Sequence, residues 1–284
     1  MTEQRRESTR ALLTRLGLDA KKSLGQNFCQ DDSLINAVMA RLSLTAGDEV
    51  WEIGPGLGAL SRALLATPVH LRLFEIDGRL TPYLEALCAV PRESGVPPAE
   101  IHWGDVLDVD LDALRALNSD RRLIVCGNLP YYCGTAIVRQ LIEMSSPPAQ
   151  LVFVLQREVV QKMAAGPGND EYGFLSVAVQ VLADVIEGPV FSPAAFFPNP
   201  AVTSGLVELR PFSLDTMARR QRNQATRIAS IVFGQRRKMA LNLLKKTLPA
   251  IPWAERFEKL GISPKARGEV IPVSHYLKLA EPAS

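Results

Sequence analysis

The sequence has no apolar run of the about eighteen residues that a membrane-spanning helix needs, and its first residues, MTEQRRESTRALL, are too polar for a signal peptide. Cysteine and histidine are scarce. The four cysteines form no CxxC pair and the three histidines lie far apart, which argues against a structural zinc site and a disulfide framework. We therefore expect a cytoplasmic protein with no membrane contact and no bound metal.

Acidic residues are missing from one segment. Between Arg219 and Lys246 the chain carries nine Lys or Arg residues and no Asp or Glu, although its total net charge is only +2, so the rest of the chain is net acidic. A basic block on an acidic body is typical of proteins that bind a polyanion, and the alternative is a solvated helix face. The absence of any balancing acid favours the polyanion.

The chain of 284 residues is long enough for one large domain and a smaller one. In its first part, β-type runs alternate with segments of helical periodicity, which predicts an α/β fold with a parallel sheet and helices on both faces. A helix is expected at 174–182, and an antiparallel strand at 204–211 should close the sheet. The other expected strands are 48–53, 69–77, 101–107, 122–128 and 150–156.

Strand patterns vanish after about residue 212, and the remaining segments are typical of short helices separated by prolines. We predict three parts: a basic N-terminal arm over 1–30, a sheet domain over 31–212, and a small all-α domain over 213–284. The first helix of the sheet domain should begin at Asp31 or Asp32 as N-cap.

Gly54, Gly56 and Gly58 follow the first expected strand and open a helix. Glycine lets the backbone turn tightly and approach a ligand, and Glu75, at the end of the second strand, can accept hydrogen bonds from ribose hydroxyls. The pattern indicates an adenosine-type ligand: NAD, FAD or S-adenosylmethionine. Asp105, at the end of the third strand, could accept from an adenine amino group or cap the following loop.

The fourth strand ends in Asn128, Leu129, Pro130 and Tyr131, at the same edge of the sheet. An exocyclic amine of a base is a poor nucleophile because its lone pair is delocalised into the ring. The Asn128 side-chain oxygen and the Leu129 carbonyl would hold the amine hydrogens and favour a tetrahedral, nucleophilic nitrogen. Pro130 fixes φ and removes a competing donor, and the Tyr131 ring can stack on a base taken out of its helix. These residues predict methyl transfer to a base, with much of the rate from proximity and orientation and no need for a general base.

Taken together, the motifs resemble the ribosomal RNA adenine N6-dimethyltransferase family, in particular its housekeeping small-subunit branch. The resemblance runs from about residue 22 to the C-terminus and rests on SLGQNFCQD, EIGPGLGALS, FEID, GDVL, GNLPYY, FVLQREVVQKM, YGFLSV, FFPNPAVTS and FGQRRKMALNLL. It implies a Rossmann-like class I methyltransferase sheet that binds S-adenosylmethionine, and a small helical C-terminal domain that binds RNA.

At the cofactor, the resemblance implies a role for Asn27 and Cys29. It places Gly54 at the methionine part, Glu75 at the ribose and Asp105 at the adenine. Most family members have leucine where Cys29 stands, and a backbone contact would tolerate this difference.

At the target base, the resemblance implies that Asn128 contacts both the cofactor and the amine. The adenine would lie between Tyr131 and Phe196, and Phe197 is adjacent to the latter. The chain departs from the family pattern at Tyr132, Asn199 and Thr203, and no role follows for Tyr132 or Cys133.

The basic block would hold RNA phosphates and give salt-dependent affinity. Its predicted contacts are Arg220, Arg222, Arg236, Arg237 and Lys238. The last three are expected to start a helix that buries Met239, Leu241, Leu243 and Leu244.

The resemblance implies N6,N6-dimethylation of two adjacent adenosines in a loop near the 3′ end of 16S-type RNA. The partner would be small-subunit ribosomal RNA in a pre-30S-type particle, and the enzyme, expected to be a monomer, would have a role in small-subunit biogenesis. Three alternatives stay open: a resistance-type methyltransferase of large-subunit RNA, a non-catalytic ribosome-assembly or transcription factor that keeps the fold, and an NAD dehydrogenase.

Overall fold

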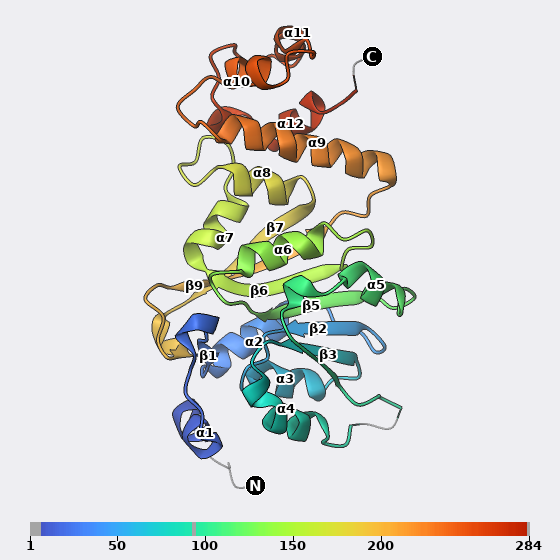
Figure 1. The fold of residues 1–284 in the computed structure, drawn as a ribbon, viewed down its shortest axis with the longest axis vertical. Coiled ribbons are helices and arrows are strands. Elements are labelled where there is room, and N and C mark those ends of the chain that lie inside the picture. Colours follow the sequence, from blue (N-terminus) through green and yellow to red (C-terminus); the bar gives the residue numbers. More distant parts are fainter. Residues whose placement is uncertain (1–6, 93–94, 283–284) are drawn as a thin grey trace. The chain divides into compact units, whose positions relative to one another are not determined.

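The computed structural model describes residues 7–92 and 95–282. The chain divides into two compact units. The first contains the segments up to Arg157 and from Ile186 to Arg210, and the second contains Glu158–Val185 and Pro211–Ser284. Figure 1 shows the helices and strands of both units.

A seven-stranded sheet has the strand order β4-β3-β2-β5-β6-β9-β7. Its strands are β2 (Glu49–Ile53), β3 (His70–Glu75), β4 (Glu100–Trp103), β5 (Leu123–Asn128), β6 (Gln150–Gln156), β7 (Ala183–Phe191) and β9 (Ser204–Pro211). Strands β2 to β6 pair in parallel, and β9 is antiparallel to β6, as predicted. The chain turns from one side of β2 to the other between β4 and β5. The carboxyl ends of β2 and β5 therefore form a topological switch point, where open α/β sheets bind ligands.

Strand β7 was not predicted, and it lies beyond β9, so β9 does not close the sheet as expected. Gly188 and Pro189 interrupt the strand pattern of its sequence. Proline is tolerated on edge strands because they have one unpaired side. The tertiary position of β7 thus permits a strand that local propensity does not favour.

Helix α2 (Asp32–Arg41) precedes the first parallel strand. The helices between the parallel strands follow the predicted alternation: α3 (Ala59–Leu65), α4 (Thr81–Cys88), α5 (Leu111–Ala116) and α6 (Gly134–Ile142). Asp31 is the N-cap of α2 and accepts from the Ser33 N–H, which confirms one of the two predicted caps. Buried residues of α2 and α3, such as Leu34 and Leu64, join Val50, Ile124 and Val152 of the central strands in one hydrophobic core. The central strands that carry the predicted site are therefore packed against these helices.

The N-terminal segment contains a helix where only an arm was expected. Helix α1 (Thr9–Leu16) buries Leu12 and Leu13 in a second cluster with Phe28 and Leu80. The 3-10 turn η1 (Lys22–Leu24) leads to β1 (Phe28–Cys29), which pairs antiparallel with β8 (Phe196–Phe197). Residues 1–6 of the predicted arm lie outside the described residues. The buried leucines explain why residues 9–29 belong to the first unit.

The second unit is helical: α7 (Arg157–Ala164), α8 (Phe174–Gln180), α9 (Thr216–Phe233), α10 (Ala240–Thr247), α11 (Trp253–Lys259) and α12 (Val273–Leu279). Helix α9 buries Ala225, Ile228, Ala229 and Val232, at the spacing of one helical face. The helix predicted at 174–182 is present as α8, and it contacts α9 and α12. Because of these contacts, residues 158–185 group with the C-terminal helices, which differs from the predicted ranges 31–212 and 213–284.

The remaining short turns are η2 (Gly78–Leu80), η3 (Val106–Asp108), η4 (Pro193–Ala195) and η5 (Gly268–Val270). One predicted helix start is wrong: α10 begins at Ala240, so Arg236, Arg237 and Lys238 lie in the turn before it. Met239 is the N-cap and is 37% exposed, although it was expected to be buried. The leucines of α10 are buried as predicted.

Candidate functional site

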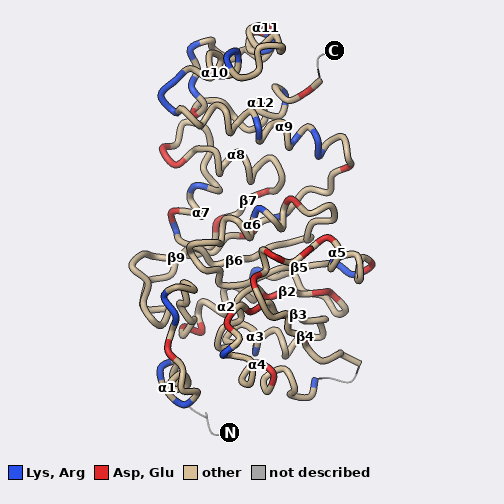
Figure 2. The backbone as a smooth tube through the Cα atoms, viewed as in Figure 1, with Lys and Arg blue, Asp and Glu red and all other residues tan. Residues whose placement is uncertain are grey.

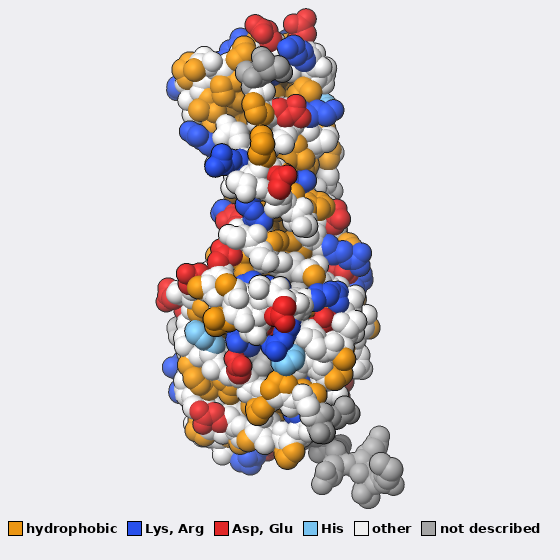
Figure 3. Space-filling view, turned by 90° about the vertical axis from the view of Figure 1, so that its right-hand side faces the viewer, with side chains coloured by type: hydrophobic (Ala, Val, Ile, Leu, Met, Phe, Trp, Pro, Cys, Tyr) orange, Lys and Arg blue, Asp and Glu red, His pale blue; other side chains and the backbone are white. Residues whose placement is uncertain are grey.

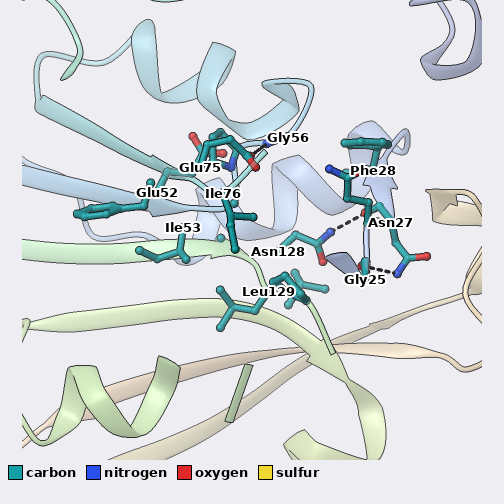
Figure 4. Close-up of a pocket in the computed structure, with 18 of the residues that line it drawn as sticks. Gly25, Asn27, Phe28, Glu52, Ile53, Gly56, Glu75, Ile76, Asn128 and Leu129 are labelled. Atoms are coloured by element: carbon teal, nitrogen blue, oxygen red, sulfur yellow. Dashed lines mark hydrogen bonds between the residues drawn. The ribbon is translucent and has the colours of Figure 1, made fainter. Parts of the chain in front are cut away.

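The carboxyl ends of β2, β3 and β5 border an open cavity of about 1120 Å³, counted with the space that opens to solvent. Most of the predicted site residues line it: Asn27, Cys29, Gly54, Gly56, Glu75, Asp105, Asn128, Leu129, Pro130 and Tyr131. Gly58 and Phe196 are not among the lining residues. Figure 4 shows how the ends of the strands and the N-terminal segment face one another across this space.

The glycine turn after β2 is tied to the end of β3. Gly54 and Gly56 have φ of 71° and 54°, a region that favours glycine. The Gly56 N–H donates to Glu75 Oε2 at 3.1 Å, and the Asp77 N–H donates to Glu75 Oε1 at 2.8 Å. Burial raises the pKa of Glu75, and these two hydrogen bonds act in the opposite direction. The carboxyl group thus holds the turn in place and lines the cavity.

Gly58 has a different role from the other two glycines. It is the N-cap of α3, and a Cβ built on it would lie 2.5 Å from Leu87 of α4. Glycine at this position therefore allows α3 and α4 to pack closely. The structure does not place Gly58 at the cavity, where the glycine pattern put it.

Asp105 caps the following turn, which is one of its two predicted roles. It is the N-cap of η3, and its Oδ1 accepts from the Leu107 N–H at 2.9 Å. No described residue donates to its second carboxylate oxygen, and the residue lines the cavity. The first oxygen positions the side chain, and the second is available to a ligand.

Asn128 ends β5 with its amide orientation set by a hydrogen bond. Its Nδ2 donates to the Asn27 carbonyl at 2.9 Å (Figure 4). Among the described residues none donates to Asn128 Oδ1 or to the Leu129 carbonyl. The Leu129 N–H donates to the Val154 carbonyl. Pro130 has no N–H, and its carbonyl accepts from Gly134. Two unused acceptors therefore follow one another at the end of β5.

The two aromatic residues predicted to enclose a base differ in the structure. Tyr131 lines the cavity, and its hydroxyl is 2.7 Å from Ser204 Oγ, which fixes the ring. Phe196, in contrast, is fully buried in the hydrophobic core with Leu34 and Leu206. Phe197 is half-buried under the guanidinium of Arg10. The structure therefore does not bring Phe196 opposite Tyr131, because β8 directs its side chain into the core.

The N-terminal segment covers one side of the cavity. Asn27 Nδ2 donates to the Gly25 carbonyl at 3.1 Å, and the Phe28 ring lies against the glycine turn, 2.9 Å from where a Gly56 Cβ would stand. Cys29, half-buried, pairs with Phe196 in the β1–β8 ladder. The family resemblance implied roles for Asn27 and Cys29 but none for Phe28, the aromatic residue between them.

Glu52 was also missed, because an acid inside a strand of apolar residues carries no motif of its own. The residue is 2% exposed and lines the cavity, and its Oε2 has no hydrogen-bond partner among the described residues. Burial, with a smaller contribution from the charge of Glu75, raises the pKa of Glu52 to about 8. It is therefore mostly uncharged at neutral pH.

The predicted RNA contacts lie in the second unit and fall into two groups. Arg222 donates to the Val181 carbonyl and lies over the Phe212 ring, and Arg236 donates to the carbonyls of Asp170 and Tyr172. Burial lowers the pKa of Arg222. Within the described part of the chain, the side chains of Arg220, Arg237 and Lys238 make no hydrogen bond or ion pair, and the Lys238 backbone N–H donates to the Gln235 carbonyl. The first group supports the fold, and the second is free to bind anions.

The basic residues of this unit gather along α9 and around the turn before α10, with few acids beside them (Figure 2). The space-filling view shows Lys and Arg side chains standing on the surface of the second unit (Figure 3). These surface side chains include residues of the basic block between Arg219 and Lys246.

No group of three or more His, Cys, Asp or Glu side chains in 7–92 and 95–282 is placed to hold a metal ion. In the same ranges no helix is long and apolar enough to cross a membrane.

The cavity fits a nucleoside with a charged tail. A Cβ on Gly54 would stand 3.6 Å from the Asn128 carbonyl oxygen, so the missing side chain leaves room between the ends of β2 and β5. Glu75 and Asp105 supply carboxylate oxygens, which accept from hydroxyl and amino groups. The Phe28 ring and Ile76 supply apolar surface. S-adenosylmethionine has each of the matching groups.

The comparisons with known proteins agree with one another. The family model described as ribosomal RNA adenine dimethylase matches residues 17–283. Ribosomal RNA small subunit methyltransferase A of Idiomarina loihiensis is 35% identical over 268 residues, which cover 94% of this chain and 89% of that protein. The protein of the same name from Aromatoleum aromaticum is 36% identical over 262 residues, 92% of each chain.

Two solved structures share the fold. A dimethyladenosine transferase from Plasmodium falciparum gives a TM-score of 0.73 at 20% identity, covering 89% of this chain and 95% of that one. The 23S rRNA methyltransferase ErmE gives 0.67 at 22% identity, covering 89% and 98%. At these identities the similarity concerns the Rossmann-like fold with its helical C-terminal part.

Proposed function

The chain belongs to the ribosomal RNA adenine dimethylase family, and we propose that it transfers methyl groups from S-adenosylmethionine to N6 of adenosine in small-subunit ribosomal RNA. In finer detail, the substrate would be two adjacent adenosines in a loop near the 3′ end of 16S-type RNA, in a pre-30S-type particle. The protein would act as a monomer, where ribosomes are assembled in the cytoplasm.

One observation carries the proposal: the two unused acceptors at the end of β5. Asn128 Oδ1 and the Leu129 carbonyl accept from no described donor and line the cavity beside the glycine turn. An adenine N6 amine has two hydrogens to donate to this pair, and donating both draws its lone pair out of conjugation. The Asn27 carbonyl keeps the amide from rotating, since it binds the Asn128 NH₂ group.

The cofactor would lie between the glycine turn and the ends of β3 and β4. When bound, S-adenosylmethionine supplies an electrophilic methyl group on its sulfonium. Glu75 would accept from the ribose and the free Asp105 oxygen from the adenine, while Gly54 lets the methionine part approach Asn128. Asn27, Phe28 and Cys29 would exclude water from this side of the cavity.

The target base would stack on Tyr131, whose ring is fixed by Ser204. Base stacking of this kind replaces the neighbours that the adenine loses when it leaves its loop. Phe196 does not supply the opposite ring, because its side chain is buried in the core. In each transfer N6 would attack the methyl carbon, the thioether S-adenosylhomocysteine would leave, and the methylated nitrogen would lose one proton to solvent. After the first transfer the amine keeps a single N–H, so only one of the two acceptors is used in the second transfer.

RNA affinity would come from the basic surface of the second unit, in particular Arg220, Arg237 and Lys238. Their charges make no ion pair with described residues, so they can neutralise phosphates and release counterions. Phosphate contacts carry no sequence information by themselves. Target choice would thus depend on the shape of the RNA and on unpaired adenines.

The proposal is tested by incubating the protein with tritiated S-adenosylmethionine and unmethylated small ribosomal subunits, followed by nucleoside analysis. We expect N6,N6-dimethyladenosine in the small-subunit RNA. Asn128→Ala should remove nearly all turnover, because it removes one acceptor, while subunit affinity stays within a few-fold. Ser204→Ala is a control from the same site that removes only the support of Tyr131.

Three outcomes would overturn parts of the proposal. Label only on large-subunit RNA would indicate the resistance-type activity. Tight subunit binding without label would indicate an assembly factor without catalysis. Loss of subunit binding in Asn128→Ala would mean that this residue holds RNA and does not act on the amine.

A further inference from the structure

Tyr132 is exposed at the cavity although its neighbours are not. Its side chain lines the cavity and is 62% exposed. Among the exposed large hydrophobic residues of the described chain it is the only aromatic one. It follows Tyr131 directly, so it stands on the turn that carries the groups assigned to the target base. Exposing an aromatic ring to water costs free energy, so an exposed ring at a cavity indicates a surface that a binding partner can cover.

The Tyr132 ring packs against Gly25 and Pro130. A Cβ on Gly25 would lie 3.1 Å from Tyr132 Cδ1 and 3.4 Å from Pro130 Cβ, so the ring edge rests where Gly25 has no side chain. Gly25 has φ +61° and donates to the Lys22 carbonyl at 3.0 Å, which ends η1. The Gly25 carbonyl in turn accepts from Asn27. The ring is therefore held in place, and its free surface is solvent-facing.

A cationic side chain, that of Lys22, belongs to a residue three positions before Gly25. Lys22 is exposed and makes no ion pair with any described residue. A tyrosine phenol is uncharged at neutral pH, and partial burial raises the pKa of the Tyr132 phenol further, so the ring does not repel phosphate. An aromatic ring with a nearby cation is the usual combination for binding a single-stranded nucleotide.

We propose that Tyr132 is a stacking platform for a nucleotide of the RNA substrate at the mouth of the cavity, and that Lys22 contributes to holding its phosphate. This inference rests on the proposed function and adds a specificity-determining residue to it. Stacking is tolerant of base identity, because every base has a π-face. The platform would thus recognise that the strand is unpaired, and favour loops over helical RNA.

The test compares Tyr132→Ala, Tyr132→Phe and the wild type. KM and kcat are measured with unmethylated small subunits, and Kd for S-adenosylmethionine is measured by calorimetry. We expect Tyr132→Ala to raise KM for subunits about tenfold, within the range that base–aromatic stacking gives, with kcat and cofactor affinity within twofold. Tyr132→Phe keeps the ring and should match the wild type.

The matched control is Leu117→Ala, an exposed apolar residue of the same unit that does not line the cavity. It should change neither KM nor Kd. An unchanged KM in Tyr132→Ala would overturn the inference, and so would a selective loss of cofactor affinity, which would assign the ring to the cofactor adenine near Asp105. If the wild type itself does not methylate small subunits, the proposed function fails, which is a separate result.

Discussion

Replacing Glu52 by glutamine should change how the stability of the first unit depends on pH. The free energy of unfolding of Glu52→Gln, compared with that of the wild type, should increase as the pH rises from acidic to alkaline values. Glu52 is 2% exposed on β2, and burial raises its pKa to about 8. In the unfolded chain a glutamic acid has a pKa of about 4.3. The folded state therefore binds the proton more tightly than the unfolded state does.

The sign and size follow from this difference. The stabilising effect of the bound proton is complete below about pH 4.3 and is lost as pH rises towards the folded pKa, by about 1.36 kcal/mol for each pH unit. Between pH 5.5 and 7.5 the wild type should lose roughly 2 kcal/mol through this one group. Glu52→Gln does not titrate, so the difference between variant and wild type should grow by that amount.

The assay is hydrogen exchange of the β2 amides at the two pH values, in wild type and in Glu52→Gln. These amides report on opening of the first unit alone, which avoids mixing its unfolding with that of the second unit. Glu100→Gln, a surface acid whose side chain is 68% exposed, is the matched control and should show no such pH dependence.

A constant difference between variant and wild type across the two pH values would refute the reasoning, because Glu52 would then be charged throughout. An infrared band of a protonated carboxyl group, present in the wild type at pH 7 and absent in Glu52→Gln, would support it independently.

Two further changes test the site and the basic surface. Gly56→Ala places a Cβ 2.9 Å from the Phe28 ring, at a residue whose φ is 54°. We expect calorimetry to show a loss of S-adenosylmethionine affinity of about tenfold, which Phe28→Leu in the same chain should partly restore. Unchanged affinity in Gly56→Ala would contradict the packing argument. Arg237 and Lys238 changed together to Ala should reduce the slope of log K for subunit binding against log salt by about two, one for each phosphate contact, with an unchanged melting temperature. Arg222→Ala should instead lower the melting temperature, because the Arg222 guanidinium donates to the Val181 carbonyl. A lower melting temperature in the Arg237 and Lys238 variant, with a smaller salt slope in Arg222→Ala, would mean that Arg222 binds RNA and that the other two support the fold.

Much of the site could be predicted because its signals are local. The turn Gly54–Gly58 and the run Asn128–Tyr131 each require particular residues within a few positions, and both appear at strand ends as predicted. The strand alternation likewise predicted that the central strands pair in parallel and that β9 is antiparallel. Each of these features depends on neighbours in sequence or on the general rules of parallel sheets.

Other features depend on residues far away in the chain and had no local signal. Phe196 is buried because β8 pairs with β1, more than a hundred residues earlier. Arg222 belongs to a basic run, and only the position of α8 shows that its guanidinium is used inside the unit. Residues 158–185 resemble any crossover segment, and their contacts with α9 and α12 assign them to the second unit.

The sequence by itself therefore determined the fold class, the family and the chemical groups at the strand ends. These depend on periodicity and on residue types that only a few conformations accept. Tertiary structure decided which of those groups are available. It buries Phe196 and leaves Tyr132 exposed, keeps Glu52 protonated away from water, and ties Asn128 to the Asn27 carbonyl. Burial and hydrogen bonding are properties of three-dimensional neighbours, and a one-dimensional pattern does not contain them.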